Sequence, residues 1–351
     1  MLSARAVTAK PRRSGTALFA RLASQFAKVG VSALAIFLIV RQVDVHAMAG
    51  VLSKADATDV LVVVAVYLIG QALTAWRWCL IARRVGFVES MGDFLRYYFV
   101  GMFFNLFGPS TLGGDVVRAL YLGASAGRRT VAMHTVVFDR LSGLIMLVVV
   151  AVSAIVLFGR FGLPLPMIAV VIASGAAMTI GWFLVPPLAR RFLSSDGRMN
   201  RLVERDLKPF WRDRRLLVRT AGISVGFHIV QASSLILLGS AISMHVDWRY
   251  YFIFHPLVTV LSAVPVSVAG LGIREAGYVW FLQRQGVAID TATAFGILWF
   301  AVLLASSLVG GLVYLWSGAA VPTLRGRPRA AEPVALAQAA GEDDTQFPSA
   351  S

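Results

Sequence analysis

The stretch ATAFGILWFAVLLASSLVGGLVYLW, residues 292–316, contains no charged side chain. A transmembrane α-helix needs about 20 consecutive apolar residues, so this stretch is long enough to cross a bilayer. Similar stretches recur along the chain, and of its 351 residues 58% are apolar and only 15% are charged. Soluble domains average about 45–50% apolar and about 25% charged residues. The composition therefore excludes a soluble enzyme and predicts an all-α, polytopic membrane protein.

Six apolar stretches predict full membrane spans, because each approaches the length that a bilayer requires. They cover about 29–40, 60–81, 131–158, 166–185, 216–242 and 292–316. The first also resembles the apolar part of a signal peptide, since basic residues precede it and Ala47-Met48-Ala49 has the form of a cleavage site. Cleavage within residues 1–49 is therefore an alternative to a first span.

Basic residues orient these spans. Lys and Arg number 33 against 18 Asp and Glu, a formal net charge of +15. They gather at the ends of apolar stretches, which indicates positive-inside orientation and not a nucleic-acid partner. We expect a plasma (inner) membrane protein with both termini cytoplasmic. Its parts are a basic N-terminus (1–28), a transmembrane domain (29–317, halves about 29–187 and 216–317, basic cytoplasmic loop 188–215) and a disordered tail (318–351).

The sequence offers no motif for a cofactor or a metal. Cys79 is its single cysteine, and its five histidines lack the spacing of metal ligands. A phosphate-binding P-loop, an HExxH helix and a GxSxG elbow do not occur. We therefore expect no cofactor and assign no catalytic residue.

Two further apolar segments are interrupted by helix-breaking residues. Segment 95–122 contains Asn105, Pro109 and the Gly113-Gly114 pair, and segment 250–282 contains Pro256, Pro265, Gly270 and Gly272. With six spans placed by charge, each segment begins and ends on one side of the membrane. We expect two re-entrant helix pairs that enter from opposite faces, and about eight helices in all.

The interrupted segments resemble each other. Pro109-Ser-Thr-Leu-Gly-Gly-Asp-Val-Val-Arg118 matches Pro265-Val-Ser-Val-Ala-Gly-Leu-Gly-Ile-Arg274, and an Arg-Tyr-Tyr-Phe run precedes each. Interrupted segments in corresponding places of two inverted halves indicate the midplane site of a transporter. We expect the glycines to turn the chain tightly, Asp115 to cap a helix, and the free N–H groups there to bind an anion. The alternative is two kinked helices that pack through glycine.

Three charged pairs lie in or beside apolar segments: Asp115 with Arg118, Asp139 with Arg140, and Arg274 with Glu275. Adjacent residues on a helix do not face each other, so we expect the second and third pairs to reach across helices, whereas Asp115 and Arg118 pair locally. A salt-bridge network between the re-entrant elements explains these charges. The other interpretation is that Arg118, Arg140 and Arg274 bind a lipid phosphate.

Four motifs in order resemble the transmembrane-region family of lysylphosphatidylglycerol synthase, a flippase-like membrane domain. They are Asn105-x-x-x-Pro109, Gly113-Gly114-Asp115-x-x-Arg118, Phe138-Asp139-Arg140-Leu-x-Gly143, and Pro265 through Gly270, Gly272-x-Arg274-Glu275. The resemblance implies a stand-alone membrane domain without the aminoacyl-transferase domain, and re-entrant helices. Asp139 stands where the family more often has Glu, and the last motif has fewer glycines than usual.

The thirteen residues of these motifs that we select as substrate-binding or gating candidates are Asn105, Pro109, Gly113, Gly114, Asp115, Arg118, Asp139, Arg140, Pro265, Gly270, Gly272, Arg274 and Glu275. The hypothesis is that the protein moves an anionic phospholipid or a lipid-linked precursor between leaflets. The alternatives are a membrane-embedded glycosyl or acyl transferase, and an accessory subunit that binds a cytosolic lipid-modifying enzyme through its basic loop.

Overall fold

The computed structural model describes residues 44–107, 113–192, 208–263 and 270–317. The predicted span at 29–40, Pro109, Pro265 and the tail 318–351 lie outside the described residues. Within the described ranges all regular structure is helical, which confirms the all-α prediction. The helices are α2 (Val45–Lys54), α3 (Ala57–Arg84), α4 (Met91–Phe107), α5 (Gly113–Ser125), α6 (Arg129–Phe158), α7 (Leu165–Phe192), α9 (Lys208–Arg212), α10 (Arg214–Ala241), α11 (Trp248–Ala263), α12 (Ile273–Gln283) and α13 (Ile289–Ser317).

Four of these helices, α3, α6, α10 and α13, are long and apolar enough to cross a membrane. Each coincides with a predicted span. Helix α7 covers the predicted span at 166–185, although its apolar part, Leu165–Gly181, is shorter. Aspartates fix two of the helix starts: the Asp56 carboxylate accepts from the backbone N–H of Thr58 at 2.7 Å, and Asp213 accepts from that of Leu216 at 2.9 Å.

Each interrupted segment is a pair of helices. The first pair is α4 and α5, and the second is α11 and α12. Gly270 (φ 76°) and Gly272 (φ 82°) hold the left-handed conformation that the tight-turn prediction required. Two expectations were wrong: Pro256 lies inside α11 without ending it, and Gly113-Gly114 forms the first turn of α5 and not a turn before it.

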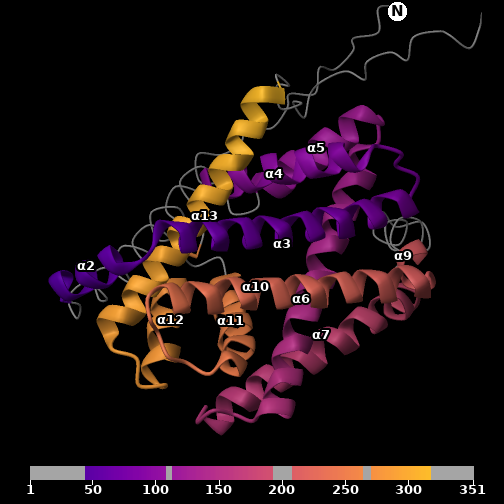
Figure 1. Ribbon diagram of the computed structural model, residues 1–351. Helices are drawn as coiled ribbons and strands as arrows, with labels where there is room; N and C mark the ends of the chain where they lie inside the picture. Colours follow the sequence, from indigo (N-terminus) through magenta and orange to yellow (C-terminus); the bar gives the residue numbers. More distant parts are fainter. Residues whose placement is uncertain (1–43, 108–112, 193–207, 264–269, 318–351) are drawn as a thin grey trace, which may run out of the picture.

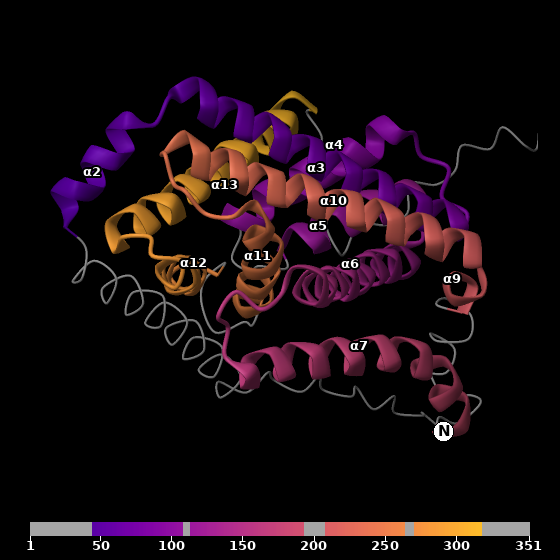
Figure 2. The same cartoon turned by 60° about the horizontal axis from the view of Figure 1, so that its bottom comes forward.

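The two pairs lie at opposite ends of α13 (Figures 1 and 2). Helix α12 packs on the start of α13, where Tyr278 meets Phe295, and α4 packs on its end, where Phe104 meets Tyr314. Helices α3 and α10 run side by side between the pairs, and α6 contacts both α5 and α11. The long helices therefore connect two pairs that are separated in space.

Each pair has its own aromatic core, and the Arg-Tyr-Tyr-Phe runs supply both. Tyr97 and Tyr98 lie in the core of α3, α4 and α5, together with Trp78. Tyr250 and Tyr251 lie in the core around α11, α12 and α13. Each Arg-Tyr-Tyr-Phe run therefore lies in the first helix of its pair and buries its two tyrosines.

Candidate functional site

Five charged residues from three helices meet inside the protein. Arg77 comes from α3, Asp115 and Arg118 from α5, and Asp139 and Arg140 from α6. The side chains of the first four are almost fully buried, with 1–7% of their surface exposed. We call these five residues the arginine–aspartate cluster. The prediction that Asp139 and Arg140 reach across helices is confirmed, because each contacts partners on another helix.

Asp139 is held by two arginines. Its Oδ1 accepts from Nε of Arg77 at 2.8 Å, and its Oδ2 accepts from Nη2 of Arg118 at 3.1 Å. Arg77 also donates to the Ser224 hydroxyl of α10 at 2.7 Å and to the Asp139 carbonyl at 3.1 Å. Arg77 thereby ties α3 to both α6 and α10. Gly143 makes this possible, since a Cβ there would lie 2.9 Å from both terminal nitrogens of Arg77.

Asp115 connects α5 to α6. Its Oδ1 accepts from Nε of Arg140 at 3.0 Å and from Nη2 of Arg140 at 2.9 Å. Nε of Arg118 lies 3.2 Å from the same oxygen, which confirms the predicted local pair three residues apart. Asp115 is the third residue of α5 and its carboxylate is occupied by these arginines, so the expectation that it caps the helix was wrong.

The cluster carries an uncompensated positive charge. Three arginines meet two aspartates, so their formal charges sum to +1. The guanidinium of Arg118 also lies over the rings of Trp78 and Tyr98, at 5.0 Å and 5.1 Å, which stabilises the cation without neutralising it. Its buried Nε and Nη1 have no hydrogen-bond partner among the described residues. The cluster can therefore accept a further anion.

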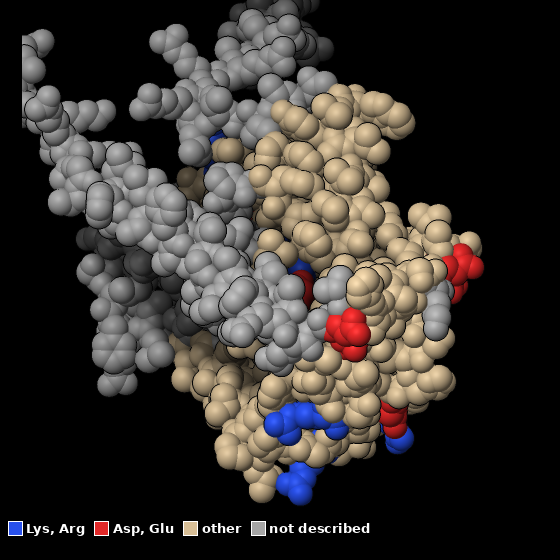
Figure 3. Space-filling model, turned by 90° about the vertical axis from the view of Figure 1, so that its left-hand side faces the viewer, with Lys and Arg blue, Asp and Glu red and all other residues tan. Residues whose placement is uncertain are grey.

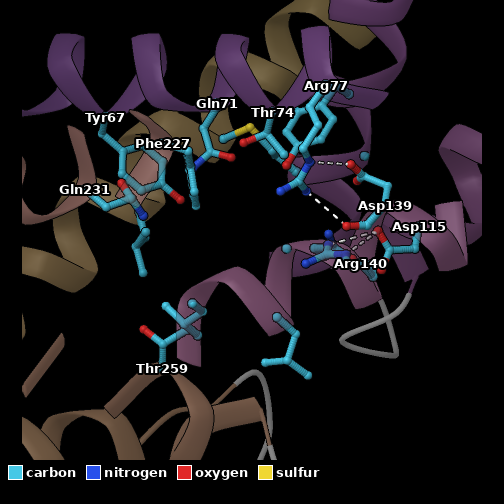
Figure 4. A pocket seen from close by; sticks show the side chains of 18 of the residues that line it. Tyr67, Gln71, Thr74, Arg77, Asp115, Asp139, Arg140, Phe227, Gln231 and Thr259 are labelled. Carbon is cyan, nitrogen blue, oxygen red and sulfur yellow. Dashed lines mark hydrogen bonds and ion pairs between the residues drawn. The ribbon is translucent and has the colours of Figure 1, made fainter. Parts of the chain in front are cut away.

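All five charged residues line a cavity of about 620 Å³ (Figure 4). Arg140 differs from the other two arginines, because 51% of its side-chain surface is exposed, against 5% for Arg77 and 2% for Arg118. Figure 3 shows basic and acidic atoms recessed in a hollow on one face of the molecule. Ligand pockets commonly measure about 300–1,000 Å³, so the cavity has room for a lipid headgroup.

The rest of the cavity lining carries no charge and combines polar side chains with apolar ones such as Leu144, Leu147 and Phe227. Helix α3 contributes Tyr67, Gln71 and Thr74, and α11 contributes His255, Thr259 and Ser262. Residues spaced by three and four lie on one face of a helix, so each set forms a stripe that faces the cavity. Helix α10 adds His228 and Gln231. In Figure 4, Tyr67, Gln71 and Gln231 lie on one side of the cavity and Asp115, Asp139 and Arg140 on the other.

Asn105 and the glycine pair position the cluster. The Asn105 side-chain oxygen accepts from the backbone N–H of Gly114 at 2.9 Å, so this N–H is not free to bind an anion. A Cβ at Gly114 would lie only 1.7 Å from the carbonyl oxygen of Gly101, and one at Gly113 would lie 3.1 Å from that of Phe104. The glycines therefore allow α5 to cross α4 closely enough to bring Asp115 and Arg118 to α6.

Arg274 and Glu275 do not join the cluster. The expectation that their charges pair across helices was wrong, because they pair with each other; only the Arg274 guanidinium also reaches α13, where it lies 5.7 Å from the ring of Phe300. Nε and Nη2 of Arg274 donate to Oε1 of Glu275 at 3.0 Å and 2.6 Å. Glu275 also accepts from the backbone N–H of Gly272 at 2.7 Å. These are long side chains in the first turn of α12, so they can bend toward each other although their Cα atoms are adjacent. Neither residue lines the described cavity.

Arg77, the neutral stripe on α3 and the polar residues of α10 were missed by sequence reasoning. The available signal was Tyr67, Gln71, Thr74 and Arg77 at helical spacing within an apolar helix. Such a stripe must face protein or water, because lipid satisfies neither hydrogen bonds nor charge. The described residues contain no group of three or more His, Cys, Asp or Glu side chains that is arranged to hold a metal ion.

Long apolar helices, two helix pairs and a charged internal cavity define an all-helical, multi-pass membrane protein. The chain belongs to the family described as the lysylphosphatidylglycerol synthase TM region, whose model matches residues 25–311. It is similar to a UPF0104 membrane protein of Methanothermobacter thermautotrophicus, with 26% identity over 298 residues that cover 76% of this chain and 86% of the relative. The family assignment made from the four motifs is thus confirmed.

Proposed function

We propose that this protein moves an anionic phospholipid or a phosphate-containing lipid-linked precursor between the leaflets of the membrane. The observation that carries the proposal is the arginine–aspartate cluster, with its net charge of +1, on the wall of a cavity inside a membrane protein. A lipid phosphate supplies the anion that the cluster lacks.

The energetics favour an anionic occupant. A charged side chain at the centre of a membrane helix costs about 2.5–3.5 kcal/mol. Pairing offsets most of this cost for the two aspartates and for two of the arginines. The third arginine has no carboxylate of its own. Because Arg140 shares Asp115 with Arg118 and is half exposed to the cavity, it is the cation best placed to bind a phosphate. The planar guanidinium suits bidentate phosphate binding.

Alternating access between the two helix pairs is the mechanism that we propose. The pairs are separated along α13, and the cluster lies beside the first of them. We propose that both pairs are re-entrant and enter the plasma (inner) membrane from opposite faces, with the chain termini cytoplasmic. Movement of the pairs against α3, α6, α10 and α13 would open the cavity to each leaflet in turn.

Leaflet exchange in proteoliposomes tests the proposal. Purified protein is reconstituted with a fluorescent, phosphate-containing lipid, and dithionite then bleaches only the outer leaflet. We expect bleaching to exceed the one-leaflet limit with the wild type and to stop at that limit with Arg140→Gln. Arg249→Gln is the matched control, because Arg249 has a similar exposure of 47% and pairs with Asp247 away from the described cavity.

Absence of exchange for all phosphate-containing lipids by folded wild-type protein would refute transport. The same vesicles are analysed by mass spectrometry for a changed headgroup, because chemical conversion of the lipid would favour the transferase alternative. Co-purification of a cytosolic lipid-modifying enzyme that depends on residues 188–215 would favour the accessory-subunit alternative.

A further inference from the structure

The neutral end of the cavity contains polar groups that the charged cluster does not use. His228 and Gln231 of α10 line the cavity and are 6% and 8% exposed. Neither ring nitrogen of His228 has a hydrogen-bond partner within the described residues, nor does the side-chain oxygen of Gln231. The His228 ring lies beside the backbone of Gly143 and near Arg77, so it stands between the neutral end of the cavity and the arginine–aspartate cluster.

A buried polar atom without a hydrogen-bond partner lowers stability, so its presence in a cavity indicates that a bound ligand supplies the partner. Buried side-chain polar atoms in proteins nearly always have a hydrogen-bond partner, and each exception needs an explanation. Here the three atoms belong to two residues one helical turn apart that line the same cavity. Tyr67 and Gln71 of α3 lie on the same side of the cavity as Gln231 (Figure 4). These residues form what we call the neutral subsite: Tyr67, Gln71, His228 and Gln231.

Charge decides which headgroups fit this subsite. All the charged residues among the described lining belong to the arginine–aspartate cluster, and both of its aspartates already bind arginines. A cationic amine at the neutral end would find no free carboxylate there and would be repelled by the cluster's net positive charge. Hydroxyl groups, by contrast, both donate and accept hydrogen bonds, as the Gln231 amide and the His228 imidazole require of a partner.

From this arrangement we infer that the substrate is a lipid phosphodiester whose phosphate carries a neutral, hydroxyl-bearing group such as glycerol or a hexose. The phosphate lies at Arg140 and the hydroxyl groups bind Gln231 and His228. The inference deepens the proposed function and rests on it for the position of the phosphate. Phosphatidylglycerol and a hexosyl polyprenyl phosphate share this chemistry, and phosphatidylethanolamine does not.

Equilibrium binding to the detergent-purified full chain tests the inference without requiring transport. The probe is fluorescent phosphatidylglycerol, displaced by unlabelled phosphatidylglycerol, hexosyl polyprenyl phosphate, phosphatidylmethanol or phosphatidylethanolamine. Phosphatidylmethanol has the same charge as phosphatidylglycerol and lacks the hydroxyls. We expect the two hydroxylated lipids to bind about tenfold more tightly than phosphatidylmethanol, the effect of one or two hydrogen bonds. Tighter binding of phosphatidylglycerol than of hexosyl polyprenyl phosphate, or the reverse, identifies which of the two lipids carries the recognised headgroup.

Variants of the subsite separate recognition from folding. We expect Gln231→Leu and His228→Leu to bind all the anionic lipids as weakly as phosphatidylmethanol. Both should unfold at about the wild-type temperature or above it, because each substitution removes at least one unpartnered buried polar atom. Gln285→Leu is the control, since Gln285 bonds to the Phe161 carbonyl away from the cavity. Equal binding of phosphatidylglycerol and phosphatidylmethanol by the wild type would overturn the inference, as would unchanged selectivity in both variants.

The outcomes for the two proposals differ. Selective binding without leaflet exchange would retain the neutral subsite and refute transport. Exchange of phosphatidylglycerol, phosphatidylmethanol and phosphatidylethanolamine at equal rates would retain transport and refute the subsite.

Discussion

Substitution of Arg140 by glutamine separates the charge that binds a ligand from the charges that hold the helices together. Arg140 donates two hydrogen bonds to Asp115 and exposes 51% of its side chain. After the substitution Asp115 still pairs with Arg118, and Asp139 still pairs with Arg77 and Arg118. The two arginines and two aspartates that remain sum to zero, so the cluster stays paired and loses its affinity for an anion.

The magnitudes of the two effects differ. The Asp115 side of the Arg140 pair is only 7% exposed, but Asp115 keeps Arg118 as a partner after the substitution, so we expect Arg140→Gln to cost less stability than the about 3–5 kcal/mol of a fully broken buried pair. A hydrogen bond to a charged group contributes about 1.5–3 kcal/mol, so loss of the Arg140–phosphate contact should weaken lipid binding about 10- to 150-fold. Arg118→Gln should lower the free energy of unfolding much more than Arg140→Gln does, because a broken buried pair costs about 3–5 kcal/mol. Only the second variant should lose its fold readily.

The assay combines unfolding in increasing SDS with lipid binding and leaflet exchange on the same preparations. Arg249→Gln, outside the cavity, is the control for removal of a half-exposed arginine. Binding of anionic lipid by Arg140→Gln at wild-type strength would refute the reasoning. So would a loss of stability in Arg140→Gln as large as in Arg118→Gln, because the arginine would then be structural.

Three other substitutions test the packing around the cluster and the start of α10. In Gly143→Ala the new Cβ would lie 2.9 Å from Nη1 of Arg77, so we expect a loss of about 1–3 kcal/mol in SDS unfolding. In Gly114→Ala the Cβ meets the Gly101 carbonyl oxygen, and we expect no monodisperse folded protein in size-exclusion chromatography. In Asp213→Asn the unfolding temperature should fall less between neutral and acid pH than it does in the wild type.

The reason for the last prediction is the N-terminus of α10. The backbone N–H of Leu216, and to a smaller extent Arg84, hold the pKa of Asp213 below its ordinary value of 3.8. A lowered pKa in the folded state stabilises the fold above pH 3.8, and this contribution is lost as the pH falls through the folded-state pKa. An acid profile of Asp213→Asn that matches the wild type would contradict the assignment.

Controls for the glycine predictions come from the same fold. A Cβ at Gly222 on α10 would have nothing within 4 Å, so Gly222→Ala should be neutral or stabilise by up to about 1 kcal/mol. If Gly143→Ala behaves like Gly222→Ala, Arg77 does not need the space beside Gly143. If Gly114→Ala is folded, the close crossing of α4 and α5 is not essential.

The turn before α12 and the local pair of Asp115 with Arg118 were predictable because each depends on neighbours in the chain. Gly270 and Gly272 turn the chain before α12 because glycine alone adopts positive φ without strain, and this property is local. Asp115 and Arg118 pair because residues three apart share a helix face. The error at Arg274 and Glu275 has a local cause as well, since the rule for adjacent residues neglects how far long side chains bend in a first turn.

Composition and periodicity were enough to determine that the protein is an all-helical membrane protein with two interrupted segments. The tertiary structure alone decided that Arg77 joins Asp139, that Arg274 stands apart, and that three arginines share two aspartates beside a cavity. Hydrophobic periodicity indicates which face of a helix is buried. It does not indicate which helix packs against that face, or at which residues the two helices cross. The partners of a buried charge depend on those crossings, so the net charge of the site appears only when the helices are packed.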